Sequence, residues 1–220
     1  MEYIAHLDGE RIQTVKEHLE GTARLAGEFA EKFGKQDWGY CCGMLHDIGK
    51  YSMDFQQRIL GENNQRVDHS TAGARVCREK GGKYSFLEYC VEGHHTGLPD
   101  FGSNFDDGSA PTLLGRRKKK ISDYEMYRTE IELPEISSYP FNMEKAVDRD
   151  FSLSVFMRMI YSCLVDADYV DTEKFMKNGE QGREAGQNIK VLFEKLENYI
   201  SGWLKNQDID TCLLYTSDAA

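Results

Sequence analysis

The fold is decided by the stretch Asp37-Trp38-Gly39-Tyr40-Cys41-Cys42-Gly43-Met44-Leu45-His46-Asp47-Ile48. Wound as a helix, it is apolar on nearly every side, and such a helix belongs in the middle of a core. His46 and Asp47 lie at its end, where two adjacent polar groups are costly unless each is paired or binds a metal. The stretch therefore predicts a central helix that ends at Gly49 and carries either a metal site or a buried ion pair.

Helical patterns continue on both sides of this central segment. Thr14 and Glu17 have the spacing of a capping box, and apolar residues recur with helical period from Val15 to Phe33. No segment alternates apolar and polar residues convincingly enough to predict a strand, so the predicted fold class is all-α. Further helices are expected around 55–60, from Asp68 to Gly81, from Tyr84 to Val91 with a break at Gly93, from Glu144 to Asp171 and from Asn188 to Leu204.

The segment from about 96 to 142 differs from the rest, because it gathers Gly, Ser, Asp and Pro and offers only a weak helical pattern near 123–129. A loop this long inside a compact domain is more often functional or mobile than merely connective. It contains the one strongly basic tract, Arg116 to Lys120. A solvated loop is the favoured interpretation of that tract, and a track that contacts a nucleic-acid backbone is the alternative.

Length and composition fit one domain, which we place at 1–206 with the irregular insertion at 96–142. Residues 213–220 do not continue the helical period and are interpreted as a non-native or read-through tail. No apolar run approaches the roughly 18 to 20 residues that span a bilayer, and the N-terminus lacks the order of a signal peptide. We therefore expect a cytoplasmic protein with no membrane partner.

Two further features of the composition limit the chemistry. The six cysteines show no CxxC pairing and mostly lie in apolar helical stretches, which indicates neither a disulfide framework nor a zinc ribbon. The net charge of -10 argues against a surface covered by nucleic acid. It does not exclude a nuclease, because bound divalent cations dominate the charge of a hydrolytic site.

Histidines and aspartates recur where helical geometry can bring them together, although a lone histidine on an apolar face is usually a satisfied core residue. Asp166 and Asp168 interrupt an apolar helix and lie about 200° apart around it, so we expect only one of them to reach a shared site. The other candidates are His18 beside the buried stripe of the first helix, His46 and Asp47 at the end of the central helix, His69 in the first turn of its helix, and His94-His95 at a helix break.

Imidazole and carboxylate groups together suit iron, manganese, cobalt, nickel and zinc, whereas the absence of paired thiolates argues against a structural zinc site. A hydrolytic centre fits this donor set better. Two cations bridged by one carboxylate, roughly 3.5–4 Å apart, lower the pKa of a bound water and stabilise charge on a phosphate. Asp47 is the natural bridge.

In this order the candidates resemble the HD phosphohydrolase superfamily, and the adjoining residues resemble the HD nuclease domain of the type I CRISPR helicase-nuclease. The resemblance covers roughly residues 6–173 and is specific because five motifs occur in order. They are His18-Leu19-Glu20-Gly21-Thr22-Ala23, Leu45-His46-Asp47-Ile48-Gly49-Lys50, Asp68-His69-Ser70-Thr71-Ala72-Gly73-Ala74, Gly93-His94-His95-Thr96-Gly97-Leu98-Pro99 and Leu164-Val165-Asp166-Ala167-Asp168. Nothing in the chain resembles the helicase motors that usually follow this domain.

The resemblance implies an HD-domain helical bundle and two divalent transition-metal ions, with manganese, nickel, cobalt and iron as candidates and magnesium as a further one. It implies one ion held by His18, His46, Asp47 and Asp168, and another held by Asp47, His69, His94 and His95. Asp168 is preferred to Asp166 because family members usually present this acid directly after a small residue, here Ala167.

The resemblance also implies that Lys50 acts beside Asp47 in catalysis, meeting the scissile phosphate or the developing charge. The alternative for Lys50 is a solvated cation at a helix end, stabilised by the helix dipole. His6 is expected at most in a second layer around the metals. Ser70 and Thr71 have structural reasons to occupy the first turn of a helix.

The implied function is metal-dependent hydrolysis of single-stranded DNA in CRISPR interference. Its partners would be single-stranded DNA, a helicase domain or subunit that feeds the strand, and an RNA-guided surveillance complex that exposes it. Two alternatives stay open: an HD phosphohydrolase acting on nucleotides or cyclic dinucleotides, and a binding or scaffold module with a degraded metal site. Retention of every expected ligand type argues against the scaffold.

Overall fold

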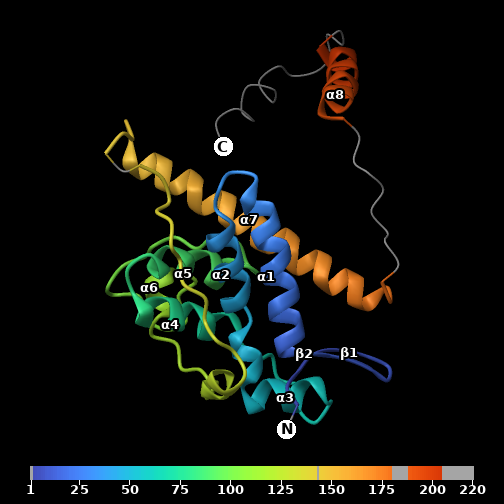
Figure 1. Ribbon diagram of the computed structural model, residues 1–220, viewed down its shortest axis with the longest axis vertical. Helices are drawn as coiled ribbons and strands as arrows, with labels where there is room; N and C mark the ends of the chain where they lie inside the picture. The colour runs from blue at the N-terminus through green and yellow to red at the C-terminus, as the bar shows by residue number, and fades with distance from the viewer. Residues whose placement is uncertain (1, 143, 180–187, 205–220) are drawn as a thin grey trace. The chain divides into compact units, whose positions relative to one another are not determined.

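The computed structural model describes residues 2–142, 144–179 and 188–204, and the chain is mainly helical within them (Figure 1). The chain divides into two units, Met1–Gly179 and Glu180–Ala220. The first contains β1 (Ile4–Asp8), β2 (Arg11–Thr14), α1 (Val15–Glu31), α2 (Gln36–Leu45), the 3-10 helix η1 (Ile48–Tyr51), α3 (Met53–Ile59), α4 (Ser70–Lys80), α5 (Tyr84–Gly93), α6 (Leu113–Arg116), the 3-10 helix η2 (Glu125–Thr129) and α7 (Arg149–Met176). This arrangement confirms the predicted all-α class with a long irregular insertion.

The second unit is described only over residues 188–204, which form α8 (Ile189–Leu204) as predicted. The tail 213–220 lies outside the described residues, and the extent of the HD domain to residue 206 stays a prediction. None of the described helices is both long and apolar enough to cross a membrane.

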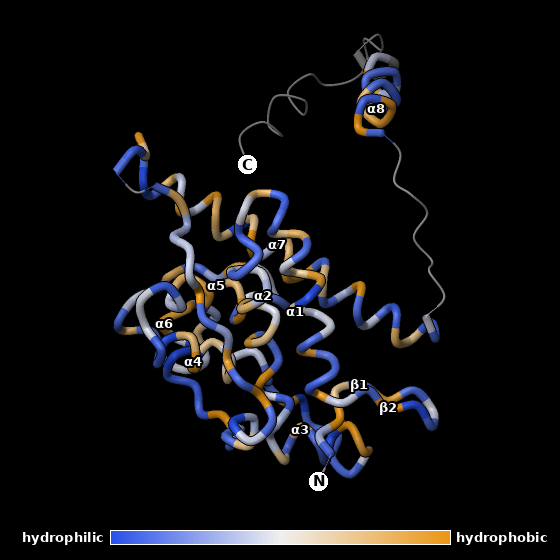
Figure 2. The backbone as a smooth tube through the Cα atoms, in the orientation of Figure 1, coloured by the Kyte–Doolittle hydropathy of each residue, from blue (hydrophilic) through white to orange (hydrophobic). Residues whose placement is uncertain are grey.

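The predicted central helix, α2, does lie in the core. It packs against α1 over its length and also contacts α4, α5 and α7, while α1 packs against α7 (Figure 1). The α1–α2 approach is close because Gly39 and Gly43 of α2 face the backbone of α1, where a Cβ on either would collide. Figure 2 shows hydrophobic stretches on α2 and α5, and Trp38 at the start of α2 is fully buried.

The end of α2 differs from the prediction. The helix stops at Leu45, and Asp47 has φ -116° and ψ 23° before η1 begins, so Gly49 lies inside η1 and does not end the central helix. Consecutive residues of one helix point about 100° apart, which would send His46 and Asp47 in different directions. The turn at Asp47 removes this restriction and lets both side chains face one site.

The prediction that no strand is present was wrong. β1 and β2 pair as an antiparallel hairpin that places His6 opposite Gln13, and Gly9 supplies the positive φ that its turn requires. The Asp8-Gly9 pair is typical of a hairpin turn and could have indicated one, but each strand is too short to show a clear alternation of apolar and polar residues. The hairpin runs directly into α1, whose predicted capping box is present, with Thr14 and Glu17 satisfying each other's backbone donors.

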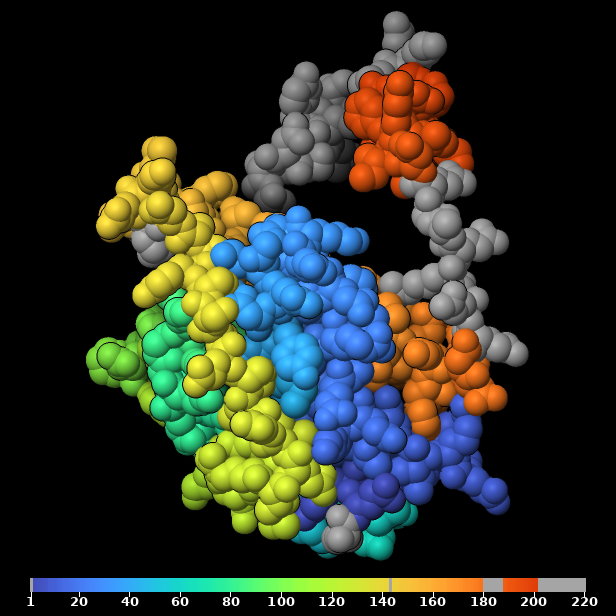
Figure 3. Space-filling view, viewed as in Figure 1, coloured from blue at the N-terminus to red at the C-terminus, as the bar shows by residue number. Residues whose placement is uncertain are grey.

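The insertion folds back onto the bundle through specific polar contacts. Near its end, the Asp37 carboxylate accepts hydrogen bonds from the backbone nitrogens of Ser137 and Ser138 at 2.9 and 2.8 Å, and the Tyr51 hydroxyl donates to Glu130 at 3.0 Å. In Figure 3 the residues of this part, coloured yellow to yellow-green, lie over the blue surface of the early helices. The long helix α7 then starts at Arg149, five residues later than predicted, because the Asp148 side chain caps it.

We predict that Asp37→Asn lowers the free energy of unfolding at pH 7 by about 1 kcal/mol, the usual scale for a hydrogen bond to a charged group that is partly solvated. Burial raises the pKa of Asp37, but the hydrogen bonds from Ser138 and Ser137 outweigh it and lower that pKa below its ordinary value. The stabilisation is therefore present above the unfolded-state pKa and is lost as pH falls through the folded-state pKa. Urea unfolding of both proteins from pH 7 to pH 3 should show the difference shrinking at the acidic end. A difference independent of pH would contradict this account.

Candidate metal centre

Four side chains from two helices and the turn after α2 form the inner group: His18, His46, Asp47 and Asp168. His18 comes from α1, His46 and Asp47 from the end of α2, and Asp168 from the middle of α7. Asp47 Oδ2 lies 3.3 Å from His18 Nε2 and 3.4 Å from His46 Nε2, and Asp168 Oδ1 lies 3.3 and 3.6 Å from the same two nitrogens. Both histidines are fully buried.

The outer group shares Asp47 with the inner group and adds His69, His94 and His95. His69 immediately precedes α4, and His94 and His95 immediately follow α5. Asp47 Oδ1 lies 3.2 Å from His94 Nε2 and 3.6 Å from His69 Nε2, while His69 Nε2 lies 2.7 Å from His95 Nε2. Asp47 thus presents Oδ2 to the inner group and Oδ1 to the outer group.

The ring orientations follow from hydrogen bonds on the far side of each imidazole. His46 Nδ1 donates to the carbonyl oxygen of Gly43, and His94 Nδ1 donates to that of Val91, both at 2.7 Å. His18 Nδ1 donates to the carboxylate of Asp171 at 2.9 Å. A proton on Nδ1 leaves the Nε2 lone pair of each neutral ring pointing into the cluster, which is the arrangement that metal-bound histidines adopt.

Asp171 is the main contributor to the site that the sequence interpretation missed. It is buried and lies one turn after Asp168 on α7, where it accepts from both His18 Nδ1 and Gln13 Nε2. Gly21 of α1 makes room for it, because a Cβ at Gly21 would collide with its carboxylate. The spacing of three residues from Asp168 was a usable signal, since such residues are neighbours on a helix. Asp166 lies instead on an exposed part of α7.

The metal-free site is strongly polarised. Burial raises the pKa of Asp47, but the charges of Lys50 and His46 outweigh it and hold that pKa well below its ordinary value. Burial lowers the pKa of His46, but the carboxylates of Asp47 and Asp168 raise it to about 10. In the outer group, burial lowers the pKa of His69, and burial with the nearby His94 lowers that of His95 to about 4. His69 and His95 are therefore neutral at pH 7, the form that binds metal.

Lys50 is buried and its Nζ lies 2.8 Å from Asp47 Oδ2. This position excludes the alternative of a solvated cation at a helix end. His6, expected at most in a second layer, lies behind the ammonium, with its Nε2 3.2 Å from Lys50 Nζ.

The donor set fits divalent cations. Asp47 Oδ1 and His94 Nε2 are buried side-chain atoms without a hydrogen-bond partner, and both face the outer group. Nε2 atoms also face each other in pairs, 3.2 Å apart between His18 and His46 and 2.7 Å apart between His69 and His95. Buried polar atoms are otherwise nearly always paired, so a cation at the outer group would satisfy the two atoms that the protein leaves unpaired, and the donors of the inner group also fit a divalent cation.

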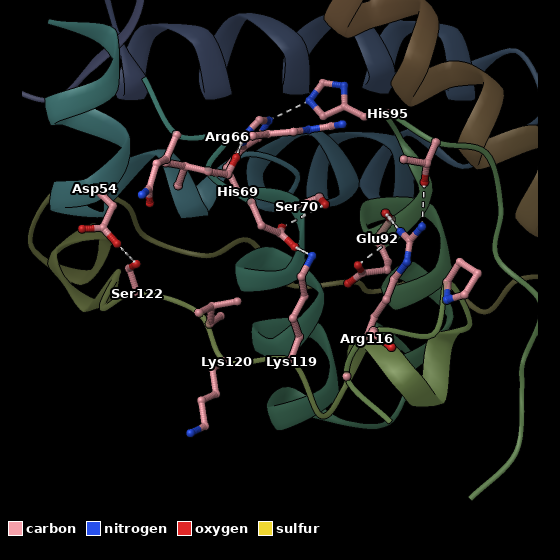
Figure 4. A pocket seen from close by; sticks show the side chains of 18 of the residues that line it. Asp54, Arg66, His69, Ser70, Glu92, His95, Arg116, Lys119, Lys120 and Ser122 are labelled. Atoms are coloured by element: carbon pink, nitrogen blue, oxygen red, sulfur yellow. Dashed lines mark hydrogen bonds and ion pairs between the residues drawn. The ribbon is translucent and has the colours of Figure 1, made fainter. Parts of the chain in front are cut away.

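His69 and His95 also line a pocket of about 650 Å³ that brings solvent to the outer group (Figure 4). The pocket walls are charged. Its ion pairs are Arg116 with Glu92 and Lys119 with Asp68, and the other charged lining residues are Arg66, Lys120 and Asp54. His95, Arg66 and Lys120 are exposed.

The basic tract is mostly engaged within the fold. Arg117 binds the buried Glu88 through two nitrogens at 2.7 and 2.6 Å, and Lys118 donates to the carbonyl oxygen of Asn104 at 2.7 Å. Together with the ion pairs of Arg116 and Lys119 in the pocket wall, these contacts hold the tract against α4 and α5. The tract is therefore more ordered than the solvated loop that was the favoured interpretation. Thr71 at the start of α4 donates to Glu92 at 3.0 Å, in keeping with a structural role.

A family model described as HD domain matches residues 15–128, and the chain therefore belongs to the HD domain family. An HD domain implies a metal-dependent phosphohydrolase, and both residue groups above fit divalent metal binding. No curated protein matches the chain.

We predict that Asp168→Ala removes one bound manganese or nickel ion per chain, because only this carboxylate of the acidic pair faces His18 and His46. Asp166→Ala is the matched control and should bind metal as the unaltered protein does. Metal content after dialysis, measured by atomic emission, separates the two variants. Loss of metal from Asp166→Ala with retention in Asp168→Ala would reverse the assignment.

Proposed function

We propose that this chain is a nuclease that hydrolyses phosphodiester bonds of single-stranded DNA in type I CRISPR interference. The observation that carries the proposal is the Asp47 carboxylate, which faces two metal-binding groups at once, with the outer group open to a charged pocket. Support for DNA as substrate comes from the five ordered motifs of the HD nuclease domain of the CRISPR helicase-nuclease.

In the proposed reaction, His18, His46, Asp47 and Asp168 hold one cation, and Asp47, His69, His94 and His95 hold the other. When bound, the cations make water nucleophilic at neutral pH and neutralise charge on the phosphate. Asp47 fixes the separation of the two groups through its two oxygens. Lys50, held against Asp47, contributes a positive charge toward the phosphate.

The exposed residues around the outer group favour a polymeric substrate. A nucleotidase of this superfamily would be expected to enclose a small substrate, whereas here His95 of the outer group is exposed to solvent. Arg66 and Lys120 are the lining cations without an ion-pair partner among the acidic residues of the wall. They are suited to contact phosphates on either side of the reacting one, and such contacts do not depend on base sequence.

A helicase domain or subunit that feeds the strand, and an RNA-guided surveillance complex that exposes it, belong to the same proposal. They explain how a nuclease acting on single strands reaches duplex DNA. Manganese, nickel, cobalt and iron are the metals best suited to the mixed imidazole and carboxylate donors, and magnesium is a further candidate.

We predict that metal-stripped protein regains cleavage of circular and linear single-stranded DNA when one of these metals is restored. The same samples should leave mononucleotides and cyclic dinucleotides intact. The measurement is gel and chromatographic analysis of all substrates with each metal added separately. Hydrolysis of nucleotides or cyclic dinucleotides without DNA cleavage would replace this proposal with the nucleotide phosphohydrolase.

Asp47→Ala should abolish cleavage. That result would show that the cleavage by the unaltered protein does not come from a contaminating nuclease. Because Asp47 is buried against Lys50, that variant can also lose stability. His95→Ala is the second control, since His95 is exposed and its removal disturbs the core least. His95→Ala should stay folded by thermal unfolding while cleavage falls by at least roughly 100-fold, the upper end of the loss seen when a residue that only supports a metal ligand is removed.

Removal of the positive side chains of Arg66 and Lys120 should weaken DNA binding with little effect on the chemical step. We predict that Arg66→Ala and Lys120→Ala each raise KM for single-stranded DNA and each lower the slope of log affinity against log salt by about 0.7. Arg24→Ala, an exposed change of equal charge on α1 outside the pocket, should leave both unchanged. An equal effect of all three variants would show that only the net charge of the protein matters.

A further inference from the structure

His6, Gln13 and Asp171 form a continuous hydrogen-bonded chain behind the candidate metal centre. His6 Nδ1 lies 2.7 Å from Gln13 Oε1, and Gln13 Nε2 donates to Asp171 Oδ2 at 2.8 Å. The same carboxylate oxygen accepts from His18 Nδ1 at 2.9 Å. At the other end, His6 Nε2 lies 3.2 Å from Lys50 Nζ. These hydrogen bonds therefore connect Lys50 to His18, a residue of the inner group.

The direction of every hydrogen bond between Asp171 and Lys50 follows from the Asp171 carboxylate. Asp171 is a carboxylate and can only accept, so Gln13 must turn its amide NH₂ toward it. Gln13 Oε1 then faces His6 and can only accept, which requires a proton on His6 Nδ1. A neutral ring with a proton on Nδ1 carries a lone pair on Nε2, and that lone pair faces the Lys50 ammonium.

The β1–β2 hairpin explains how these groups come together. Its register places His6 directly opposite Gln13, and Arg11 anchors the hairpin to the end of α7 by donating to the carbonyl oxygen of Phe175 at 2.9 Å. α7 in turn carries Asp171. The position of the His6 ring is therefore fixed from both sides, by the hairpin and by α7.

The groups that face the His6 ring favour its neutral form. The Lys50 ammonium has only donors, so the His6 Nε2 that lies 3.2 Å from its Nζ must present a lone pair, while Gln13 Oε1 requires a proton on Nδ1. A neutral ring is the form that can accept from Lys50.

We propose that His6 is a positioning residue that holds the Lys50 ammonium against Asp47, and that Gln13 sets the tautomer in which His6 can do so. Lys50 has three N–H donors, of which one points to Asp47 and one to His6. The inference rests on the proposed function only in assigning Lys50 to phosphoester hydrolysis. The tautomer itself is a property of the metal-free protein.

Two conservative variants separate the two ends of the His6 ring. The amide of glutamine reaches the place of Nε2, so His6→Gln can still accept from Lys50. The amide of asparagine reaches only the place of Nδ1, so His6→Asn keeps the contact with Gln13 and loses the one with Lys50. We expect His6→Gln to keep kcat within a few-fold and His6→Asn to lower it by roughly 10-fold to 100-fold, with KM and metal content unchanged in both. Thermal unfolding of the two variants should match.

The tautomer is tested without activity, by long-range ¹H–¹⁵N correlation spectra of the metal-free protein at pH 7. We expect the His6 proton on Nδ1 and, in Gln13→Leu, its loss from that nitrogen as the preferred site. A proton on Nε2 of His6 in the unaltered protein, full activity of His6→Asn, or equal loss of activity in both His6 variants would each overturn the inference. Failure of the unaltered protein to hydrolyse any phosphoester would instead remove the proposed function and leave the tautomer result standing.

Discussion

The structure depends on one carboxylate. Asp47 is buried and lies between two sets of imidazoles, with Oδ2 toward His18 and His46 and Oδ1 toward His69 and His94. A buried carboxylate with this many neighbours is stable only if positive charge surrounds it. Lys50 supplies one such charge, and the unpartnered Asp47 Oδ1 and His94 Nε2 indicate where further positive charge belongs.

The fold brings segments that are distant in the sequence together around the Asp47 carboxylate. α1 and α7 both pack against α2 and deliver His18 and Asp168, while the paired helices α4 and α5 place His69, His94 and His95. The backbone carbonyl oxygens of Gly43 and Val91 then fix the rings, so the orientation of the site is encoded in the ends of the helices. Gly43 contributes twice, because it also permits the close contact of α2 with α1.

The helices and the set of candidate ligands could be predicted from the sequence because each leaves a local signal. The capping box at Thr14, the apolar stretch from Trp38 and the placement of polar residues at helix ends depend only on neighbouring residues. The hairpin left only the weak Asp8-Gly9 signal, because its strands are short. The spacing of Asp171 from Asp168 could not by itself reveal its role, since that role depends on contacts with His18 and Gln13, far away in the sequence. Gln13 looks like an ordinary polar residue until the hairpin places it between His6 and Asp171.

The central claim is that Asp47 is shared by two cations. Crystals grown with manganese and measured at its absorption edge test this most directly. The account predicts two anomalous peaks per chain, roughly 3.5–4 Å apart with the Asp47 carboxylate between them. A single peak, or two peaks of which only one contacts Asp47, would contradict it.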